Sequence, residues 1–378
     1  MSRWSLVHEE HPIQREQAGR TAGGGREPAA PCAGTMIQQH ANDSLVRTLG
    51  HSHVLLEHLN QSSVFCSRYR EGRWYCSLLL ALYALALPVG VLGNVAALLN
   101  YTCFRRAWTA SSVFLLNLAL CDSAWILTLP FSLYFSLQTP SRRDAQTFCQ
   151  FKRVSFNISV YGSILFLTLV SFDRYAGTVH PLGSLRWWGV GRARLCSCAV
   201  WALLLLGLVP DLLLAFAVRR PGDAGACMDH IQGPFAYVVA VSVARTALGF
   251  AVPFGLMLAF YAMTARALRG RRPPRGRGGG GRGRRASRPL ALISAAVLVF
   301  VVSFVPYHAM VVTLVFMRVG GLVTAGNVSV LHASCELLEA LCCVSGALDP
   351  LLYILASERF QRRRPGCCRR SHRVGGEG

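Results

Sequence analysis

The sequence predicts an all-α integral membrane protein, in which seven transmembrane helices form one bundle and a short amphipathic eighth helix follows. Composition is the first reason: 52% of the 378 residues are hydrophobic, only 15% are charged, and the mean hydropathy is +0.37. The second is that apolar residues gather in seven runs, each of roughly the 20 residues that a helix needs to cross a bilayer. The third is that arginines gather in short tracts between these runs, which is typical of membrane orientation. The net charge of +21 therefore does not indicate a nucleic-acid partner.

The predicted bundle occupies residues 74–356, and a polar segment, residues 1–73, precedes it. This segment is rich in Gly, Pro and Gln, so we expect it to be extracellular and disordered. Asn42 and Asn60 each begin an Asn-X-Ser sequence there, which predicts N-glycosylation. The seven predicted spans lie near residues 77–104, 110–138, 149–176, 195–218, 234–265, 289–317 and 333–356.

Arginine tracts follow the first, third, fifth and seventh spans and therefore all fall on one side of the membrane. That side is predicted to be cytoplasmic, which places the N-terminus outside and the C-terminus inside. Residues 267–288 are expected to form an Arg/Gly-rich cytoplasmic loop near anionic lipid. Residues 357–378 are expected to form the eighth helix and the cytoplasmic tail, where Cys367 and Cys368 stand beside arginines as in palmitoylation sites.

Most of the 14 cysteines lie in the predicted spans, where a thiol is ordinary apolar core. Cys149 opens the third span and Cys227 lies in the outer loop before the fifth. The oxidising side of the membrane favours a disulfide between them, which would pin that loop over the bundle. The candidates for a second bridge are Cys66 with Cys335 and, as rival partners, Cys32 and Cys76.

Charged groups inside the spans need a reason, because each costs about 2.5–3.5 kcal/mol at the bilayer centre on insertion scales. Asp122 lies in the middle of the second span, and Asp349 lies in the seventh, just before Pro350. Amide and hydroxyl groups at similar depth come from Asn94, Ser163 and Ser345. We interpret these residues as one polar cluster that joins the helices and forms a hydrated site for a sodium ion. No other cofactor is expected.

The third span ends in Asp173, Arg174 and Tyr175. An arginine held by the aspartate beside it can act as a lock, because breaking the pair releases a strong fork of hydrogen-bond donors. Tyr261 in the fifth span and Tyr353 in the seventh approach the same level and could receive the arginine in another arrangement. The alternative interpretation is a plain interfacial anchor, since arginines at helix ends extend toward water.

At these positions and several others, roughly residues 75–365 resemble the rhodopsin-like (class A) G-protein-coupled receptors. One match occurs in each span, in the expected order. The matching positions are Gly93 and Asn94, Leu118 with Ala119 and Asp122, Cys149 with Asp173–Tyr175, Trp201, Pro253 with Tyr261, Phe304–His308, and Asp349–Tyr353. The chain departs from the usual pattern at Phe304, where the family has tryptophan, and at Asp349, where it has asparagine.

Both departures are familiar in the branch that holds the purinergic nucleotide receptors and their relatives for succinate and oxoglutarate. The resemblance to this branch implies that Arg153, Tyr307 and His308 contact an anionic ligand. Two positions differ from the branch: Val311 and Glu339 stand where a cation is usual. Arg245 could replace a lost cation, and Glu339 is also similar to the residue that meets a basic ligand group in chemokine and other peptide receptors.

The resemblance therefore implies a receptor for a small extracellular anion, with a peptide, chemokine-like or lipid ligand, or a non-signalling decoy receptor, as alternatives. The implied ligand contacts are Arg153, Asn157, Arg245, Tyr307, His308 and Glu339, with Tyr83 and Tyr134 at the rim. The implied activation switch consists of Asp173, Arg174, Tyr175, Tyr261, Phe300, Phe304, Pro306, Asp349, Pro350 and Tyr353. The implied partners are a heterotrimeric G protein (Gq or Gi by analogy), arrestin and receptor kinases.

Two other classes of membrane protein fit the sequence less well. A transporter is expected to show repeated halves with broken helices, and the sequence has no internal repeat. An enzyme would need a nucleophile with its base, or a set of metal ligands, within the spans. His308 is the only histidine deep in a predicted span, which is too few for a metal site. We therefore do not expect an enzyme.

Overall fold

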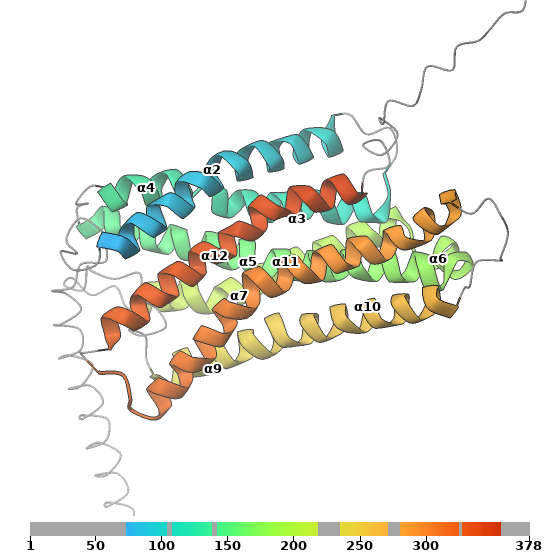
Figure 1. Ribbon diagram of the computed structural model, residues 1–378. Coiled ribbons are helices and arrows are strands. Elements are labelled where there is room, and N and C mark those ends of the chain that lie inside the picture. The colour runs from blue at the N-terminus through green and yellow to red at the C-terminus, as the bar shows by residue number, and fades with distance from the viewer. Residues whose placement is uncertain are drawn as a thin grey trace, which may run out of the picture. The chain divides into compact units, whose positions relative to one another are not determined.

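The computed structural model describes residues 73–103, 108–137, 142–217, 235–270, 280–324 and 327–356. Every regular element in these ranges is helical, and seven helical segments are long and apolar enough to cross a membrane. The prediction of a seven-helix membrane bundle is therefore confirmed (Figure 1). The candidate spans are Tyr75–Thr102, Ala110–Phe135, Thr147–Val179, Val190–Leu213, Phe235–Gly270, Pro289–Val319 and Val330–Pro350.

Two spans contain more than one helical element. The second span is divided between two helices, the fifth contains a segment of wide turns, and a short helix follows the third. The elements are α2 (Arg73–Thr102), α3 (Ala110–Ile126), α4 (Leu129–Leu137), α5 (Arg142–Val179), α6 (Pro181–Trp187), α7 (Val190–Ala217), α9 (Phe235–Ala244), the π-helix η2 (Arg245–Ala251), α10 (Val252–Gly270), α11 (Gly280–Val319) and α12 (Val328–Ala356).

Helix α5 is the central element of the bundle. It packs against α3, α7, α10 and α11, and its Ile164, Phe166 and Leu167 are completely buried. The outward faces are apolar as well: Leu92 on α2 is 72% exposed and Leu195 on α7 is 70% exposed. A protein in water would hide such side chains, whereas lipid is an apolar solvent for them. The polar groups consequently face the middle of the bundle.

Prolines account for two breaks in the spans. The second span was predicted as continuous, but α3 ends at Ile126 and α4 begins at Leu129. Pro130 has no amide hydrogen and disfavours helical geometry in the residue before it. In the fifth span, η2 ends two residues before Pro253. Wide π-turns occur where the regular hydrogen-bond ladder of a helix is interrupted.

A close approach fixes α2 against α12. A Cβ atom added to Gly93 would overlap Cγ of Pro350, so only glycine leaves room for the ring. The neighbouring Asn94 donates from Nδ2 to the carbonyl oxygen of Gly346 at 2.9 Å. The Gly-Asn pair of the first span thus sets the position of the seventh.

Several predictions concern residues outside the described ranges. These are the N-terminal segment with Asn42 and Asn60, the partners Cys66 and Cys227, and the tail with Cys367 and Cys368. The loop predicted for residues 267–288 is shorter in the structure, because α10 continues to Gly270 and α11 begins at Gly280.

Candidate functional site

A pocket lies at the end of the bundle where α5 begins, which we call the Arg153 end; the opposite end is the Arg174 end. It contains about 530 Å³ of empty space, part of which belongs to its open mouth. Its walls come from α5, α7, η2, α11 and α12. The lining residues are Cys149, Lys152, Arg153, Phe156, Asn157, Tyr161, Asp211, Arg245, Tyr307 and Glu339.

Five of the residues predicted to contact a ligand share this lining: Arg153, Asn157, Arg245, Tyr307 and Glu339. The other three lie elsewhere. His308 is buried and stacks on Phe250, with 4.1 Å between the ring centroids. Tyr83 is buried too, and Tyr134 is 60% exposed. Their contact with a ligand stays a prediction.

The first group of charges in the pocket joins α5 to α12. Nζ of Lys152 lies 2.9 Å from Oε1 and 3.0 Å from Oε2 of Glu336, and 3.2 Å from Oε2 of Glu339. Lys152 and Glu336 were not predicted from the sequence. A signal existed, because Lys152 is a charge inside a span, and Glu336 and Glu339 are three residues apart on one helix face.

The second group joins η2 to α7. Arg245 donates from Nη2 to Oδ2 of Asp211 at 2.5 Å and from Nη1 to Oδ1 at 3.1 Å, a two-pronged pair. Nη2 also donates to the carbonyl oxygen of Gly207 at 2.8 Å, and Asn157 donates to Oδ2 of Asp211 at 3.0 Å. Asp211, which was also not predicted from the sequence, therefore orients both Arg245 and Asn157.

The charges of the pocket compensate one another. Three cations, Lys152, Arg153 and Arg245, share the lining with the anions Asp211 and Glu339. Glu336, which is not among the lining residues, contacts Lys152. Asp211 and Glu339 also attract the charge of Arg153. Buried ions are costly unless they are paired. A charged ligand group can therefore enter only by sharing or replacing one of these internal partners.

An aromatic path leads from the pocket toward the middle of the bundle. Tyr307 lines the pocket and contacts the ring of His308 at 5.1 Å, and His308 stacks on Phe250. Phe250 stacks on Phe300 at 5.5 Å, and Phe300 meets Phe304 edge-on at 5.4 Å. Phe300 and Phe304, predicted to relay activation, are both completely buried. Repacking of one ring must therefore move its neighbours.

Four residues in the middle of the bundle, Asn94, Asp122, Ser163 and Tyr353, form two hydrogen bonds at the predicted polar cluster. Ser163 donates to Oδ1 of Asp122 at 2.8 Å, and the Tyr353 hydroxyl donates to Asn94 at 3.2 Å. Oδ2 of Asp122 and both carboxylate oxygens of Asp349 are buried and have no hydrogen-bond partner among the described residues.

Ser345, which was predicted to complete this cluster, is satisfied within its own helix, since its hydroxyl donates to the carbonyl oxygen of Cys342 at 2.7 Å. Within the described ranges, no group of three or more His, Cys, Asp or Glu residues could hold a metal ion.

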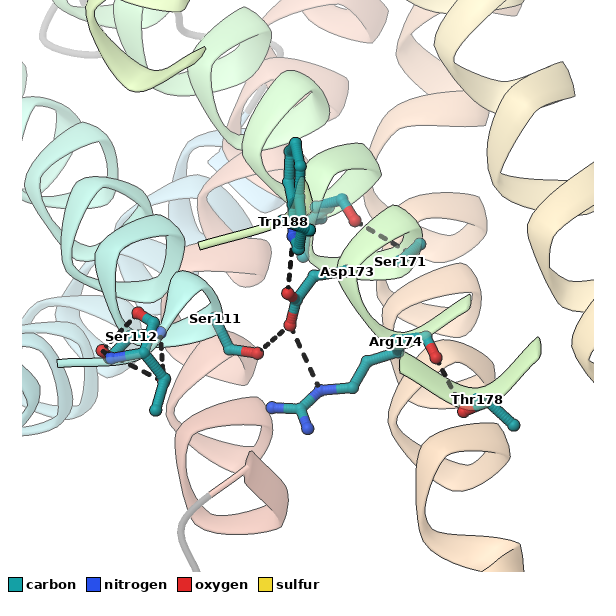
Figure 2. A network of polar contacts seen from close by, with 9 residues as sticks. Ser111, Ser112, Ser171, Asp173, Arg174, Thr178 and Trp188 are labelled. Atoms are coloured by element: carbon teal, nitrogen blue, oxygen red, sulfur yellow. Dashed lines mark hydrogen bonds and ion pairs between the residues drawn. The ribbon is translucent and has the colours of Figure 1, made fainter. Parts of the chain in front are cut away.

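At the Arg174 end, Asp173 is the centre of a second network (Figure 2). Its Oδ1 accepts from Nε1 of Trp188 at 2.9 Å, and its Oδ2 accepts a hydrogen bond from the hydroxyl of Ser111. Nε of Arg174 lies 4.0 Å from the same Oδ2. The structure thus contains the expected pair of Asp173 and Arg174, at a distance longer than a hydrogen bond.

The aromatic residues of the predicted switch lie close to this network. Tyr175 stacks on Phe260 at 5.4 Å. Tyr261 is 37% exposed, and the Tyr353 hydroxyl is engaged by Asn94. Reception of Arg174 by either Tyr261 or Tyr353 stays a prediction about another arrangement of the helices.

The cysteines agree with the sequence analysis in part. Cys149 is disulfide-bonded, and because Cys227 lies outside the described residues, their pairing stays a prediction. The suggested bridge of Cys66 with Cys335 is wrong, since Cys335 is a free thiol. It packs against the small apolar cluster around Leu314. Cys76, considered as a rival partner, is disulfide-bonded.

Comparison with known proteins identifies the family. Residues 93–353 match the family described as 7 transmembrane receptor (rhodopsin family). The chain belongs to this family. This receptor is 30% identical over 324 residues to purinoceptor 1 (Y type) of Meleagris gallopavo, covering 82% of this chain and 85% of that protein. It is 29% identical to purinoceptor 1 (Y type) of Homo sapiens, with 86% of each chain covered. It is 32% identical to purinoceptor 2 (Y type) of Rattus norvegicus, with 78% and 77% covered.

Family membership confirms the expected class of protein. The chain is a G-protein-coupled receptor of the purinergic branch, a multi-pass protein of the plasma membrane, and not an enzyme. Its partners are an extracellular ligand and a G protein.

Lys152→Met should lower the thermal stability of the purified receptor, because Glu336 and Glu339 would keep buried charges without their cation. Breaking a buried pair costs about 3–5 kcal/mol. The midpoint of thermal unfolding in detergent measures this change. Adding Glu336→Gln and Glu339→Gln to Lys152→Met should restore much of the loss, and an unchanged midpoint in the single variant would contradict the assigned role.

Proposed function

We propose that this receptor binds a small extracellular anion, of nucleotide or carboxylate type, in the pocket at the Arg153 end. The observation that carries the proposal is the convergence of Lys152, Arg153 and Arg245 on one pocket. Guanidinium groups suit phosphate and carboxylate oxygens because they offer paired donors in a plane. The relatives at about 30% identity that are named purinoceptors support a ligand of this chemistry.

The ligand must compete with the internal carboxylates. Arg245 already donates to both oxygens of Asp211, and Lys152 is held by Glu336 and Glu339. The free energy of binding is therefore the difference between the contacts of these cations with the ligand and their contacts with the internal carboxylates. Such a site favours an anion that offers two oxygens side by side to an arginine over one that offers charge alone.

A second candidate is a ligand with a basic group, such as a peptide. The observation in its favour is that Glu336 and Glu339 on α12 present two carboxylates to the single cation Lys152. A ligand cation at Glu339 would share a carboxylate that lies in the pocket wall.

The ligand must bind one arrangement of the helices more tightly than another, because a ligand with equal affinity for both does not shift the equilibrium between them. We infer that the ligand acts through Tyr307 and the aromatic path on Phe300 and Phe304, with Pro306 allowing α11 to bend. Arg174 then leaves Asp173, and a groove opens at the Arg174 end for a Gα helix. Gq or Gi is the expected partner, with arrestin and receptor kinases acting on the active form.

A ligand panel tests the proposal in cells that express the receptor, with calcium and cyclic AMP as readouts. Nucleotides and dicarboxylates should include an agonist, and basic peptides and lipids serve as the comparison. Arg153→Ala should raise the agonist concentration for half-maximal response about tenfold or more, since a hydrogen bond to a charged group contributes about 1.5–3 kcal/mol. The matched control is Arg318→Ala, because Arg318 lies at the Arg153 end near Phe235 but outside the pocket lining.

An unchanged response of Arg153→Ala to an anionic agonist would refute the assigned contact. Activation by a basic peptide alone, lost in Glu339→Gln, would establish the second candidate instead.

We further infer that the Arg174 end faces the cytoplasm and that the N-terminus lies outside. The support is the set of arginine tracts after alternate spans. This orientation exposes Asn42 and Asn60 to glycosylation, favours the disulfide of Cys149 with Cys227, and leaves the tail cysteines open to palmitoylation. An epitope placed before residue 42 should be labelled by antibody on intact cells. Labelling only after permeabilisation would reverse the topology.

We also propose an allosteric sodium ion beside Asp122 and Asp349. The buried oxygens of these carboxylates without hydrogen-bond partners fit a cation, and Asn94 and Ser163 lie in the same cluster. A bound sodium ion would supply positive charge between two carboxylates that otherwise repel each other. Sodium chloride, compared with N-methylglucamine chloride, should raise the unfolding temperature of the receptor but not that of Asp122→Asn. Equal sodium dependence of the two proteins would dismiss the site.

A further inference from the structure

The carboxylate of Asp173 has three partner residues, and Arg174 is the most distant of them. The carboxylate accepts from Trp188, which follows α6, at 2.9 Å and from Ser111 of α3, whereas Nε of Arg174 lies 4.0 Å away (Figure 2). That nitrogen has no hydrogen-bond partner among the described residues. The two neutral donors, rather than the arginine, therefore hold the carboxylate in place.

The indole of Trp188 is fixed by its surroundings. The residue caps α6, with its backbone N–H donating to the carbonyl oxygen of Ser184 at 2.8 Å. Its ring meets Phe172 edge-on at 4.9 Å and packs near Phe114 at 6.1 Å. These contacts direct the indole N–H toward Asp173. The side chain of Trp188 is therefore already held in place, and forming the hydrogen bond costs little further conformational entropy.

Release of Arg174 has a cost that these donors can reduce. The side chain of Asp173 is 13% exposed and that of Arg174 is 30% exposed. When Arg174 departs, the poorly hydrated carboxylate loses its cation, and an unsatisfied buried charge is strongly disfavoured. Trp188 and Ser111 can remain bonded to it, because neither belongs to the moving arginine.

We propose that Trp188 is a positioning residue for G-protein activation: its indole N–H stabilises Asp173 after Arg174 has been released, and so favours the active arrangement. Asp173 is held by α3 and by the segment after α6 in both arrangements, but these two hydrogen bonds contribute more after release, because the carboxylate then has no cation beside it. Arg174 changes its partner, while Asp173 keeps two of its three. The proposal rests on the release of Arg174 proposed above, but not on which ligand the pocket binds.

Trp188→Phe tests this role, because phenylalanine keeps an aromatic ring against Phe172 and removes only the N–H donor. Purified agonist-free receptor is mixed with Gi and Gq heterotrimers, and two quantities are measured: the basal rate of nucleotide exchange and the Kd for the nucleotide-free heterotrimer. We expect the variant to bind the heterotrimer about threefold to tenfold more weakly and to show lower basal exchange. This is less than the full contribution of a hydrogen bond to a charged group, because the bond exists in both arrangements and only its difference between them counts.

Three further variants separate this role from simple packing. Ser111→Ala, which removes the other neutral donor, should change both quantities in the same direction. Trp187→Phe, at the neighbouring and more exposed tryptophan (40%), should leave them unchanged. In an Asp173→Asn background, Trp188→Phe should have no additional effect, since the charge that it stabilises is gone.

Two results would overturn the proposal. One is a Kd for Trp188→Phe equal to or lower than that of the unaltered receptor, which would mean that Trp188 does not favour the active arrangement. The other is an equal loss in the Asp173→Asn background, which would mean that the indole acts through packing alone.

Discussion

Charge compensation inside an apolar solvent is the constraint on which the rest of this structure depends. Lipid surrounds the bundle, so a polar group that turns inward must find its partner on another helix. Lys152 therefore draws α5 to α12, Arg245 draws η2 to α7, and Asn94 draws α2 to α12. Two of these contacts, those of Lys152 and Arg245, also line the pocket.

Packed rings, rather than polar contacts, lead from the pocket to Phe300 and Phe304, two residues of the predicted switch. Rings from Tyr307 to Phe300 touch in series, while the charged groups described at the two ends do not share a partner. A packed row of rings has discrete arrangements and does not deform gradually. Because of this separation, the charges of the pocket can select a ligand without directly changing the contacts of Asp173 and Arg174.

The sequence was sufficient for the spans and for much of the site, but not for the pairing of charges. Apolar length determines where a helix can cross, and the motif positions placed Arg153, Arg245, Tyr307 and Glu339 in one pocket. Asp211 and Lys152 were missed because their partners depend on how each helix is rotated about its axis. The break at Pro130 and the wide turns of η2 change that rotation locally, and apolar length carries no record of either. Cys335 was mispredicted for the same reason, since on α12 it faces the apolar cluster around Leu314 of α11.

The wide turns of η2 have one more consequence. Successive residues of an α-helix are about 100° apart around its axis, and the residues of a π-helix are closer together. Converting Arg245–Ala251 to regular α-helical turns would therefore rotate Arg245 and the residues before it about the helix axis, relative to α10. The guanidinium would then point toward a different neighbour with no side chain altered. The charges that line the pocket therefore depend on the helical geometry of η2 as well as on which residues are present. Deleting a single residue from η2 would change which side chains of the fifth span face the pocket.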